Sequence, residues 1–145
     1  MRVFIAGVMQ GSRTDDKVET QDYRKVITDI LQTNLDGVEV IDPWALHPNS
    51  ETYDADSARE TFFAMTLLAG QADVLVAYLP EASMGTAVEM WEAHRQGVSV
   101  FTISGMSANW VIKLLSSQVF PSLEAFQRFV ADGGLAAVVH GTGAT

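Results

Sequence analysis

Residues 72–79 read ADVLVAYL, a nearly continuous apolar run that is as long as a strand and ends at Pro80. Runs of this length, rich in Val and Leu, are typical of a parallel strand that is buried on both faces of its sheet. Further apolar runs of strand length cover 2–7, 37–42, 98–104 and 118–120.

Segments with helical spacing of apolar residues separate these runs, and they cover 18–35, 57–71, 85–97, 108–116 and 122–132. Alternation of strands and helices predicts a parallel sheet with helices on both faces. We therefore expect an α/β fold, a flavodoxin-like (Rossmann-like) three-layer sandwich with a five-stranded sheet in the order 2-1-3-4-5. A ligand crevice is expected at the carboxyl ends of strands 1 and 3. Trp91 has the spacing of a core residue.

Composition narrows the class of protein. The 145 residues suit one domain, which we place at 1–132, followed by a tail over 133–145 that is loose or packs on a neighbouring subunit. A net charge of −9 argues against nucleic acid as the main partner.

No cysteine and only three scattered histidines argue against a metal site, and no apolar run approaches the ~20 residues of a membrane helix. We read the N-terminus as a first strand rather than a signal peptide and expect a cytoplasmic protein.

The loop after the first strand contains Gly7, Gly11, Ser12 and Arg13. Small residues let backbone N–H groups approach an anion, and the arginine supplies positive charge. The loop lacks the Lys and the spacing of a P-loop. It is either an anion-binding loop or an exposed turn.

The long loop after the second strand contains Trp44, and Asp54 and Asp56 follow near its end. An aromatic side chain there can stack on a nucleobase, and the acids can protonate or hydrogen-bond it. Each residue taken singly is equally compatible with loop packing or a solvated charge.

The segment EASMGTAVE (81–89) raises the central question of the sequence. Thr86 and Glu89 have the spacing of a helix capping box, as do Ser57 and Glu60. Alternatively, Glu89 is an ionised carboxylate near a helix N-terminus, where it can attack the anomeric carbon of a sugar. Ser83 and the neighbouring backbone N–H groups, including that of Gly85, would then hold a phosphate.

Two stretches, RVFIAG (2–7) with its Gly-Ser-Arg loop and ADVLVAYLPEASMGTAVEMWEA (72–93), resemble the nucleoside 2-deoxyribosyltransferase superfamily. The similarity is greatest to its 2'-deoxynucleoside 5'-phosphate N-hydrolases and CMP hydrolases. The resemblance implies that Glu89 is the nucleophile and that no cofactor is needed. It further implies that Ser83 and the loop residues 11–13 bind the 5'-phosphate. It also implies a homodimer or larger homo-oligomer, in which Asn109 contacts the neighbouring site.

Two positions depart from the family pattern, and Trp91, where a small residue is common, is one of them. Met65 stands where the family usually has an Asp that orients the nucleophile or protonates the leaving base. Asp54, Asp56 or Glu60 can replace it if the start of that helix faces the crevice. We therefore expect an N-glycosidase acting on a nucleoside 5'-monophosphate. The alternatives are a base-exchanging transferase, a nucleotide-binding module without chemistry, and a structural domain in which Glu89 is only a cap.

Overall fold

One sheet of five parallel strands runs through the molecule in the order β2-β1-β3-β4-β5, which confirms the predicted topology. The computed structural model describes the backbone of residues 1–141 and the side chains of residues 1–138. The strands are β1 (Arg2–Gly7), β2 (Glu39–Ile41), β3 (Val74–Tyr78), β4 (Ser99–Ile103) and β5 (Gln118–Phe120).

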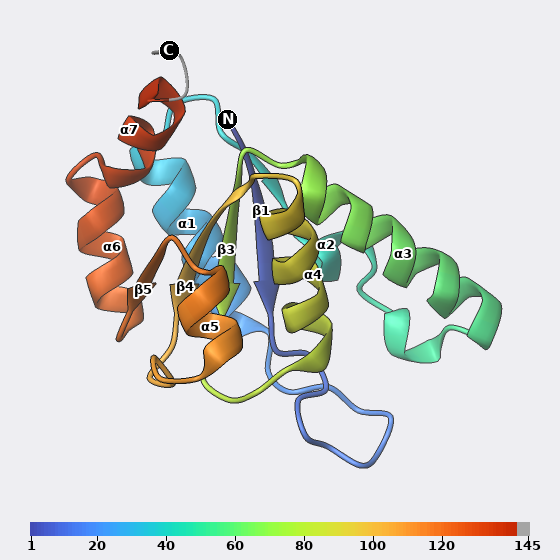
Figure 1. Cartoon of the computed structure of the whole chain (residues 1–145). Helices are drawn as coiled ribbons and strands as arrows, with labels where there is room; N and C mark the ends of the chain where they lie inside the picture. The colour runs from blue at the N-terminus through green and yellow to red at the C-terminus, as the bar shows by residue number, and fades with distance from the viewer. Residues whose placement is uncertain (142–145) are drawn as a thin grey trace.

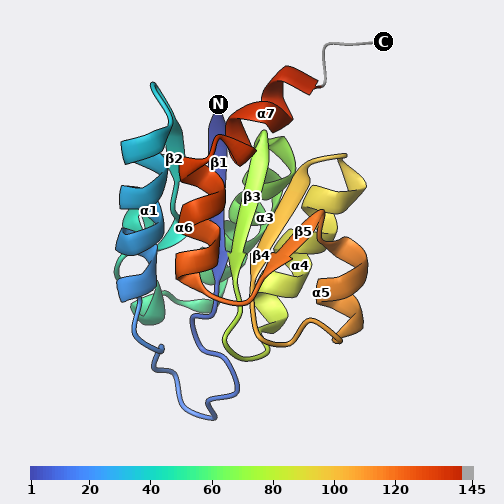
Figure 2. The same ribbon diagram turned by 90° about the vertical axis from the view of Figure 1, so that its left-hand side faces the viewer.

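Helices cover both faces of the sheet, so the predicted three-layer architecture is confirmed (Figures 1 and 2). The first face carries α1 (Asp22–Asn34), α6 (Leu123–Ala131) and α7 (Gly134–Gly141). The second face carries α3 (Ala55–Gln71), α4 (Met84–Arg95) and α5 (Trp110–Leu115). The connection from β2 to α3 contains α2 (Pro43–Leu46) and the 3-10 turn η1 (Ser50–Thr52). None of the described helices has the length and apolar character needed to cross a membrane.

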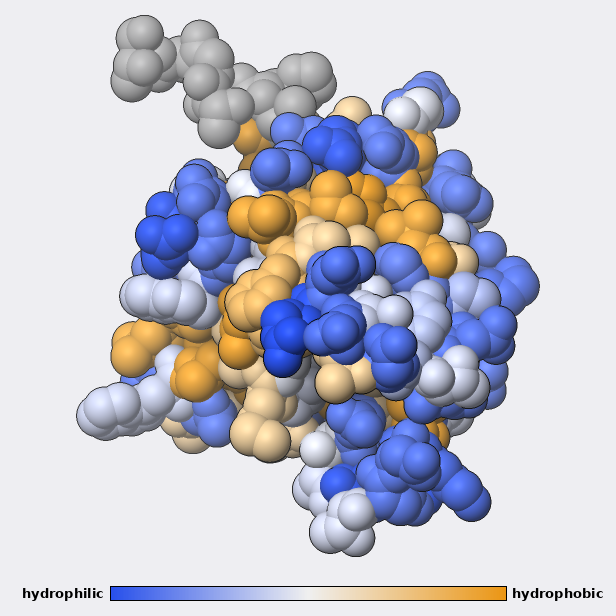
Figure 3. All heavy atoms as spheres, turned by 90° about the vertical axis from the view of Figure 1, so that its right-hand side faces the viewer, coloured by the Kyte–Doolittle hydropathy of each residue, from blue (hydrophilic) through white to orange (hydrophobic). Residues whose placement is uncertain are grey.

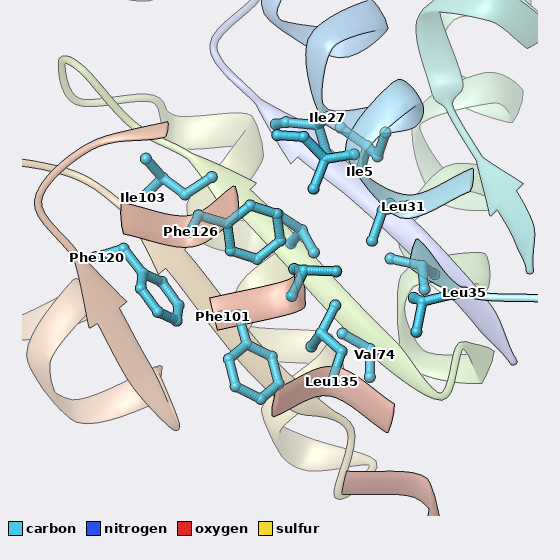
Figure 4. Close-up of a cluster of buried hydrophobic side chains, with 14 of the residues drawn as sticks. Ile5, Ile27, Leu31, Leu35, Val74, Phe101, Ile103, Phe120, Phe126 and Leu135 are labelled. Atoms are coloured by element: carbon cyan, nitrogen blue, oxygen red, sulfur yellow. The ribbon is translucent and has the colours of Figure 1, made fainter. Parts of the chain in front are cut away.

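The core is divided by the sheet into two apolar clusters. In β1, Val3 and Ile5 face α1 and α6, whereas Phe4 and Ala6 face α3 and α4, and all four are buried. Figure 4 shows the first cluster, in which Phe126 of α6 lies over the strands. Because successive strand residues point to opposite faces, burial on both faces explains why the strand sequences are apolar without alternation.

Two expectations at the periphery need correction. Residues 134–141 form helix α7, and Leu135 is fully buried in the first cluster, so this part of the expected loose tail packs on its own domain. Residues 142–145 lie outside the described residues. Trp91 is not a core residue, because 53% of its surface is exposed and its ring stacks on His94. The residues of α4 that face the sheet are instead Thr86, Met90 and Ala93.

Candidate active site

A cavity of about 310 Å³ opens at the carboxyl edge of the sheet, between α4 and α5. It is lined by the loops that follow β1, β3 and β4, and we call it the α4–α5 cavity. Four of the predicted ligand-binding residues meet there, namely Gly11, Ser12, Ser83 and Asn109. The remaining lining is mostly apolar and contains neither Lys nor Arg, and it consists of Leu79, Ala82, Met84, Ala87, Met106, Val111 and Ile112.

The loop after β1 approaches this cavity only in part. Gly11 has a positive φ of 59° and lies against the Glu81 side chain, so a Cβ atom at this position would collide with the Glu81 carboxylate. Gly7 does not line the cavity, and the ring of Tyr23 covers it so closely that no side chain fits. Gly7 therefore has a packing role against Tyr23, and its ligand role stays a prediction.

Ser83 is the residue that caps α4. Its Oγ accepts a hydrogen bond from the backbone N–H of Thr86 at 3.3 Å and another from the Thr86 hydroxyl at 3.0 Å. The predicted Thr86–Glu89 capping box is therefore wrong, because the helix begins three residues earlier than the box requires. The predicted box at Ser57 and Glu60 is wrong for the same reason, since the residue that caps α3 is Asp54.

Glu89 is consequently not folded back onto its own backbone. The side chain is only partly exposed, and its Oε2 atom is buried with no hydrogen-bond partner in the structure. Burial raises the pKa of Glu89 to about 8, and the positive charge of Arg24 opposes part of that rise. A buried carboxylate oxygen without a partner costs free energy, so such an atom points to a binding or catalytic role rather than a structural one.

Glu89 and the α4–α5 cavity lie on opposite flanks of α4. The helix advances 100° per residue, so Glu89 is turned about 200° from Ala87, which lines the cavity. Glu89 therefore lies on the flank of α4 away from this cavity and does not line it. A ligand must reach around the N-terminal turn of α4 to contact both.

The end of β1 is held by residues that sequence analysis missed. Arg24, only 3% exposed, donates hydrogen bonds to the carbonyl oxygens of Ile5 at 3.2 Å and Gly7 at 3.5 Å, and to Asp42 at 3.0 Å. Nothing in the sequence distinguishes Arg24 from a solvated arginine of α1. Only one feature of the sequence points to Asp42 as a functional residue, namely that it is polar and directly follows a strand.

Arg13, predicted to bind phosphate, is already paired. Its guanidinium forms two hydrogen bonds of 2.8 Å with Asp15 and one of 3.3 Å with Glu19. The pair with Arg13 lowers the pKa of Asp15 to about 2. Arg13 does not line the α4–α5 cavity, although its neighbour Ser12 does. Gly85 likewise lies in the first turn of α4 without lining the cavity.

The acids proposed to replace the missing family Asp lie on the exposed N-terminal end of α3, which projects away from the sheet (Figure 1). Asp54 caps that helix, and its pKa is lowered by the hydrogen bond from the Ser57 backbone. Asp56 pairs with Arg59, and Glu60 is exposed. None of the three lines the α4–α5 cavity.

The neighbourhood of the missing Asp is apolar. Met65, at the position of that Asp, is buried in the second core cluster. Trp44 is half-buried, and its backbone N–H bonds to Asp42. Among the side chains of residues 1–138, no group of three acidic or histidine side chains is arranged to hold a metal ion.

Asn109 lines the cavity of its own chain, and its side chain also caps α5 by accepting a hydrogen bond from the Val111 N–H at 3.0 Å. Its role across a subunit interface stays a prediction.

Comparison with known proteins identifies the fold. No family model matches the sequence, and no curated protein matches it either. Three solved structures are similar in fold. A 2-deoxyribosyltransferase from Bacillus psychrosaccharolyticus has a TM-score of 0.67 at 15% identity, over 88% of this chain and 90% of that chain. A conserved protein from Enterococcus faecalis V583 has a TM-score of 0.61 at 16% identity, over 90% and 97%.

The CMP N-glycosidase of Clostridium botulinum has a TM-score of 0.51 at 17% identity, over 88% of this chain and 96% of that chain. At these identities the likeness establishes a common fold. The chain therefore has the nucleoside 2-deoxyribosyltransferase fold, in agreement with the resemblance seen in the sequence. Two of these neighbours are enzymes that are named for nucleoside or nucleotide chemistry.

The raised pKa of Glu89 predicts how stability depends on pH. Below pH 4.5 the carboxyl is protonated in both the folded and the unfolded chain. Between pH 4.5 and about 8 the folded chain retains a proton that the unfolded chain releases, so wild-type stability falls over this range. Glu89→Gln removes this dependence, and at pH 8 it should be more stable than the wild type by about 1–3 kcal/mol.

Urea unfolding at several pH values measures this difference. Glu92→Gln is the matched control on the same helix, because Gln96 and Arg95 lower the pKa of Glu92. The control should differ from the wild type by a constant amount between pH 5 and 8. If the free energy of unfolding changed with pH in the same way in Glu89→Gln and in the wild type, the burial of an unpaired carboxyl at this position would be contradicted.

Proposed function

We propose that this protein is an N-glycosidase that hydrolyses the base–sugar bond of a nucleoside 5'-monophosphate, with Glu89 as the nucleophile. The observation that carries the proposal is the buried, unpartnered Oε2 atom of Glu89, on the same helix whose N-terminal turn borders a cavity. The common fold with a 2-deoxyribosyltransferase and a CMP N-glycosidase supports the same class of chemistry.

The reaction has two displacement steps. A Glu89 carboxylate oxygen attacks C1' of the sugar, the C1'–N bond breaks, and its electron pair leaves with the base, which takes a proton from water. A water molecule then attacks C1', releases the Glu89 carboxylate and loses a proton to solvent. Only the ionised carboxyl is a nucleophile, so the raised pKa of Glu89 makes the free enzyme more active as the pH rises towards 8.

The start of α4 supplies the donors for the 5'-phosphate. The Thr86 N–H is used by the Ser83 cap, which leaves the N–H groups of Met84 and Gly85 directed out of the helix end. These groups and the dipole of this 12-residue helix favour an anion. Ser83 and Glu89 are six residues apart, about 9 Å along the axis. In this proposal the phosphate binds at the first turn of α4 and the anomeric carbon lies beside its second turn.

In this proposal Arg13 supplies the positive charge that binds the phosphate, because the cavity lining contains no cation. The pairs of Arg13 with Asp15 and Glu19 are exposed, and exposed ion pairs contribute only about 0–1 kcal/mol. A phosphate bound beside Ser12 can therefore replace the two carboxylates as the partner of the Arg13 guanidinium at little cost in free energy.

A binding module without chemistry is the second candidate function. It is favoured by the core position of Met65 and by the exposed positions of Asp54, Asp56 and Glu60, so that none of the three candidate acids is placed to protonate the base. A missing general acid lowers the rate by about 10²–10⁴-fold. Base exchange is the third candidate, because a 2-deoxyribosyltransferase shares the fold.

We also propose a homodimer or larger homo-oligomer. Large apolar side chains are exposed on the adjoining helices α3 and α4, and Figure 3 shows apolar residues gathered over this side of the molecule. We call this surface the α3–α4 face, and it consists of Phe62, Phe63, Leu67, Val88 and Trp91. Contiguous apolar surface of this kind on helices is typical of a protein–protein interface.

Base release is the direct test of the reaction. Incubation with a panel of ribonucleoside and deoxyribonucleoside 5'-monophosphates should liberate free base, and Glu89→Ala should reduce that release to background, with Glu92→Gln as the control. For the wild type, kcat/KM should rise about tenfold per pH unit below a pKa of about 8 and then level off. Release from Glu89→Ala at the parent rate would refute the mechanism. Tight binding without release would favour the binding module.

Phosphate recognition is tested at Arg13. Arg13→Ala should raise KM for the nucleotide about ten- to a hundredfold, which is the loss expected for hydrogen bonds to a charged group, and leave KM for the nucleoside unchanged. Asp15→Ala frees the guanidinium and should lower KM for the nucleotide. Faster turnover of the nucleoside than of its 5'-phosphate would instead favour base exchange.

The oligomer is tested on the α3–α4 face. Phe63→Glu and Trp91→Glu place a charge on exposed apolar positions of 59% and 53% exposure and should lower the molar mass measured by light scattering to that of one chain. Val26→Glu is the control, since Val26 is 43% exposed on α1, across the sheet. A wild-type chain that is monomeric at high concentration would overturn the proposal.

A further inference from the structure

We infer that the α4–α5 cavity binds an apolar group that is esterified to the 5'-phosphate of the nucleotide. The inference rests on the proposed function and narrows its substrate class, from nucleoside 5'-monophosphates in general to those whose phosphate carries a second, apolar ester group. The reaction is unchanged, because the C1'–N bond breaks and both P–O ester bonds stay intact.

In the proposed complex the phosphate lies at the cavity and the base lies away from it. Gly11, Ser12 and Ser83 all line the cavity, so a phosphate bound by these residues is in contact with it. The base is joined to C1', which has to lie at Glu89, on the flank of α4 that is turned away from the cavity. The cavity is therefore left for a group that is attached to the other side of the phosphate.

The lining of the cavity suits an apolar group next to an anion. The Ser83 Oγ atom already accepts two hydrogen bonds from Thr86, so its O–H remains as a donor. The Asn109 Oδ1 atom accepts the Val111 N–H, so its amide N–H groups remain as donors. The rest of the wall is mostly apolar and includes Leu79, Ala87, Met106 and Ile112. Donors beside an apolar space fit a phosphate and an apolar group attached to it.

The cavity has room for more than a phosphate. An apolar cavity of about 150 Å³ stays free of water and binds a benzene ring. The α4–α5 cavity has a volume of about 310 Å³, which accommodates the phosphate together with a ring of that size or a short alkyl chain. Two of its lining residues, Met84 and Met106, are flexible enough to adapt to the shape of such a group.

The charges near the cavity match a phosphate diester better than a monoester. A monoester carries a charge of about −1.5 to −2 at pH 7, whereas a diester carries about −1. The lining contains no Lys or Arg, and the Glu81 carboxylate lies against Gly11. Arg13 is the single cation that the proposed function assigns to the phosphate. One guanidinium balances the charge of a diester, and it leaves excess charge on a monoester, which is costly to bury.

A series of esters measures the contribution of the cavity. The probes are the nucleoside 5'-monophosphate that the wild type turns over best and the methyl, ethyl, propyl and butyl esters of its phosphate. KM for base release should fall about two- to fourfold for each added CH₂ group and level off once the cavity is full. Equal KM values for the methyl and butyl esters would overturn the inference.

Two substitutions in the cavity wall should change this preference in different ways. Ala87→Leu fills part of the cavity, so KM should level off at a shorter ester. Val111→Lys places a cation in the wall, so KM for the monophosphate should fall below that for the butyl ester. Val111 is 40% exposed, so the lysine does not have to be buried for the chain to fold.

Leu114→Lys is the matched control for Val111→Lys. Leu114 is exposed on the same helix and does not line the cavity, and the substitution adds the same charge to the protein. The control should keep the order of KM values found for the wild type. If Val111→Lys also kept that order, the cavity would not be in contact with the phosphate and the inference would be wrong.

A second copy of the chain is the other candidate occupant of the cavity. In that case KM would be independent of the length of the ester, and Val111→Lys would lower the molar mass measured by light scattering. These two results together would assign the cavity to the homo-oligomer and refute its role in substrate binding.

Binding without turnover separates this inference from the proposed function. Phenyl phosphate and methyl phosphate carry nearly the same charge and differ in their apolar groups, and titration calorimetry measures the Kd of each. Phenyl phosphate should bind the wild type about tenfold more tightly or better, and it should lose most of that advantage in Ala87→Leu. This result in a protein that releases no base would uphold the cavity site and refute the glycosidase. Base release with one KM for all the esters would do the reverse.

Discussion

The sheet is buried on both faces, and this constraint determines where chemistry can occur in the molecule. Because helices cover both faces of the central strands, most of their side chains are apolar, as in Val74, Leu75 and Val76. Polar groups can gather only where the strands end and the chain turns back. The carboxyl edge is that place, since the N-terminal ends of α4 and α5 and the loop after β1 meet there.

The cap of α4 decides what Glu89 is free to do. In a capping box, the carboxylate would be used on its own helix end. Ser83 instead takes the Thr86 N–H, and α4 begins at Met84. Glu89 is thereby moved from the first turn to the second, where it borders the sheet and loses solvent without gaining a partner. Burial of the ionised carboxyl costs free energy, and the protonated carboxyl avoids most of that cost. The pKa of Glu89 is raised for this reason.

The sequence was sufficient for the architecture and insufficient for the fine structure of the site. Apolar runs of strand length and helical spacing report burial directly, so the strand order followed from general rules of handedness and connection. The start of α4 could not be placed, because Ser83 and Thr86 are both residues that commonly cap helices. Arg24 and Asp42 were missed because their pairing depends on the short length of β2, a property of the folded sheet. Trp91 was misassigned because spacing does not show which side of a helix faces the sheet.

Two arginine–carboxylate pairs stand near the same edge, and their exposure gives them different properties. The pair of Arg13 and Asp15 has side-chain exposures of 33% and 45%, so water competes with it and an incoming anion can replace the carboxylate. The pair of Arg24 and Asp42 is 3% and 14% exposed, and breaking it would leave a buried charge unpaired. A protein with a net charge of −9 repels anions at long range. Arg13 can therefore exchange its partner for a ligand, as the proposed function requires, whereas Arg24 is a permanent part of the fold.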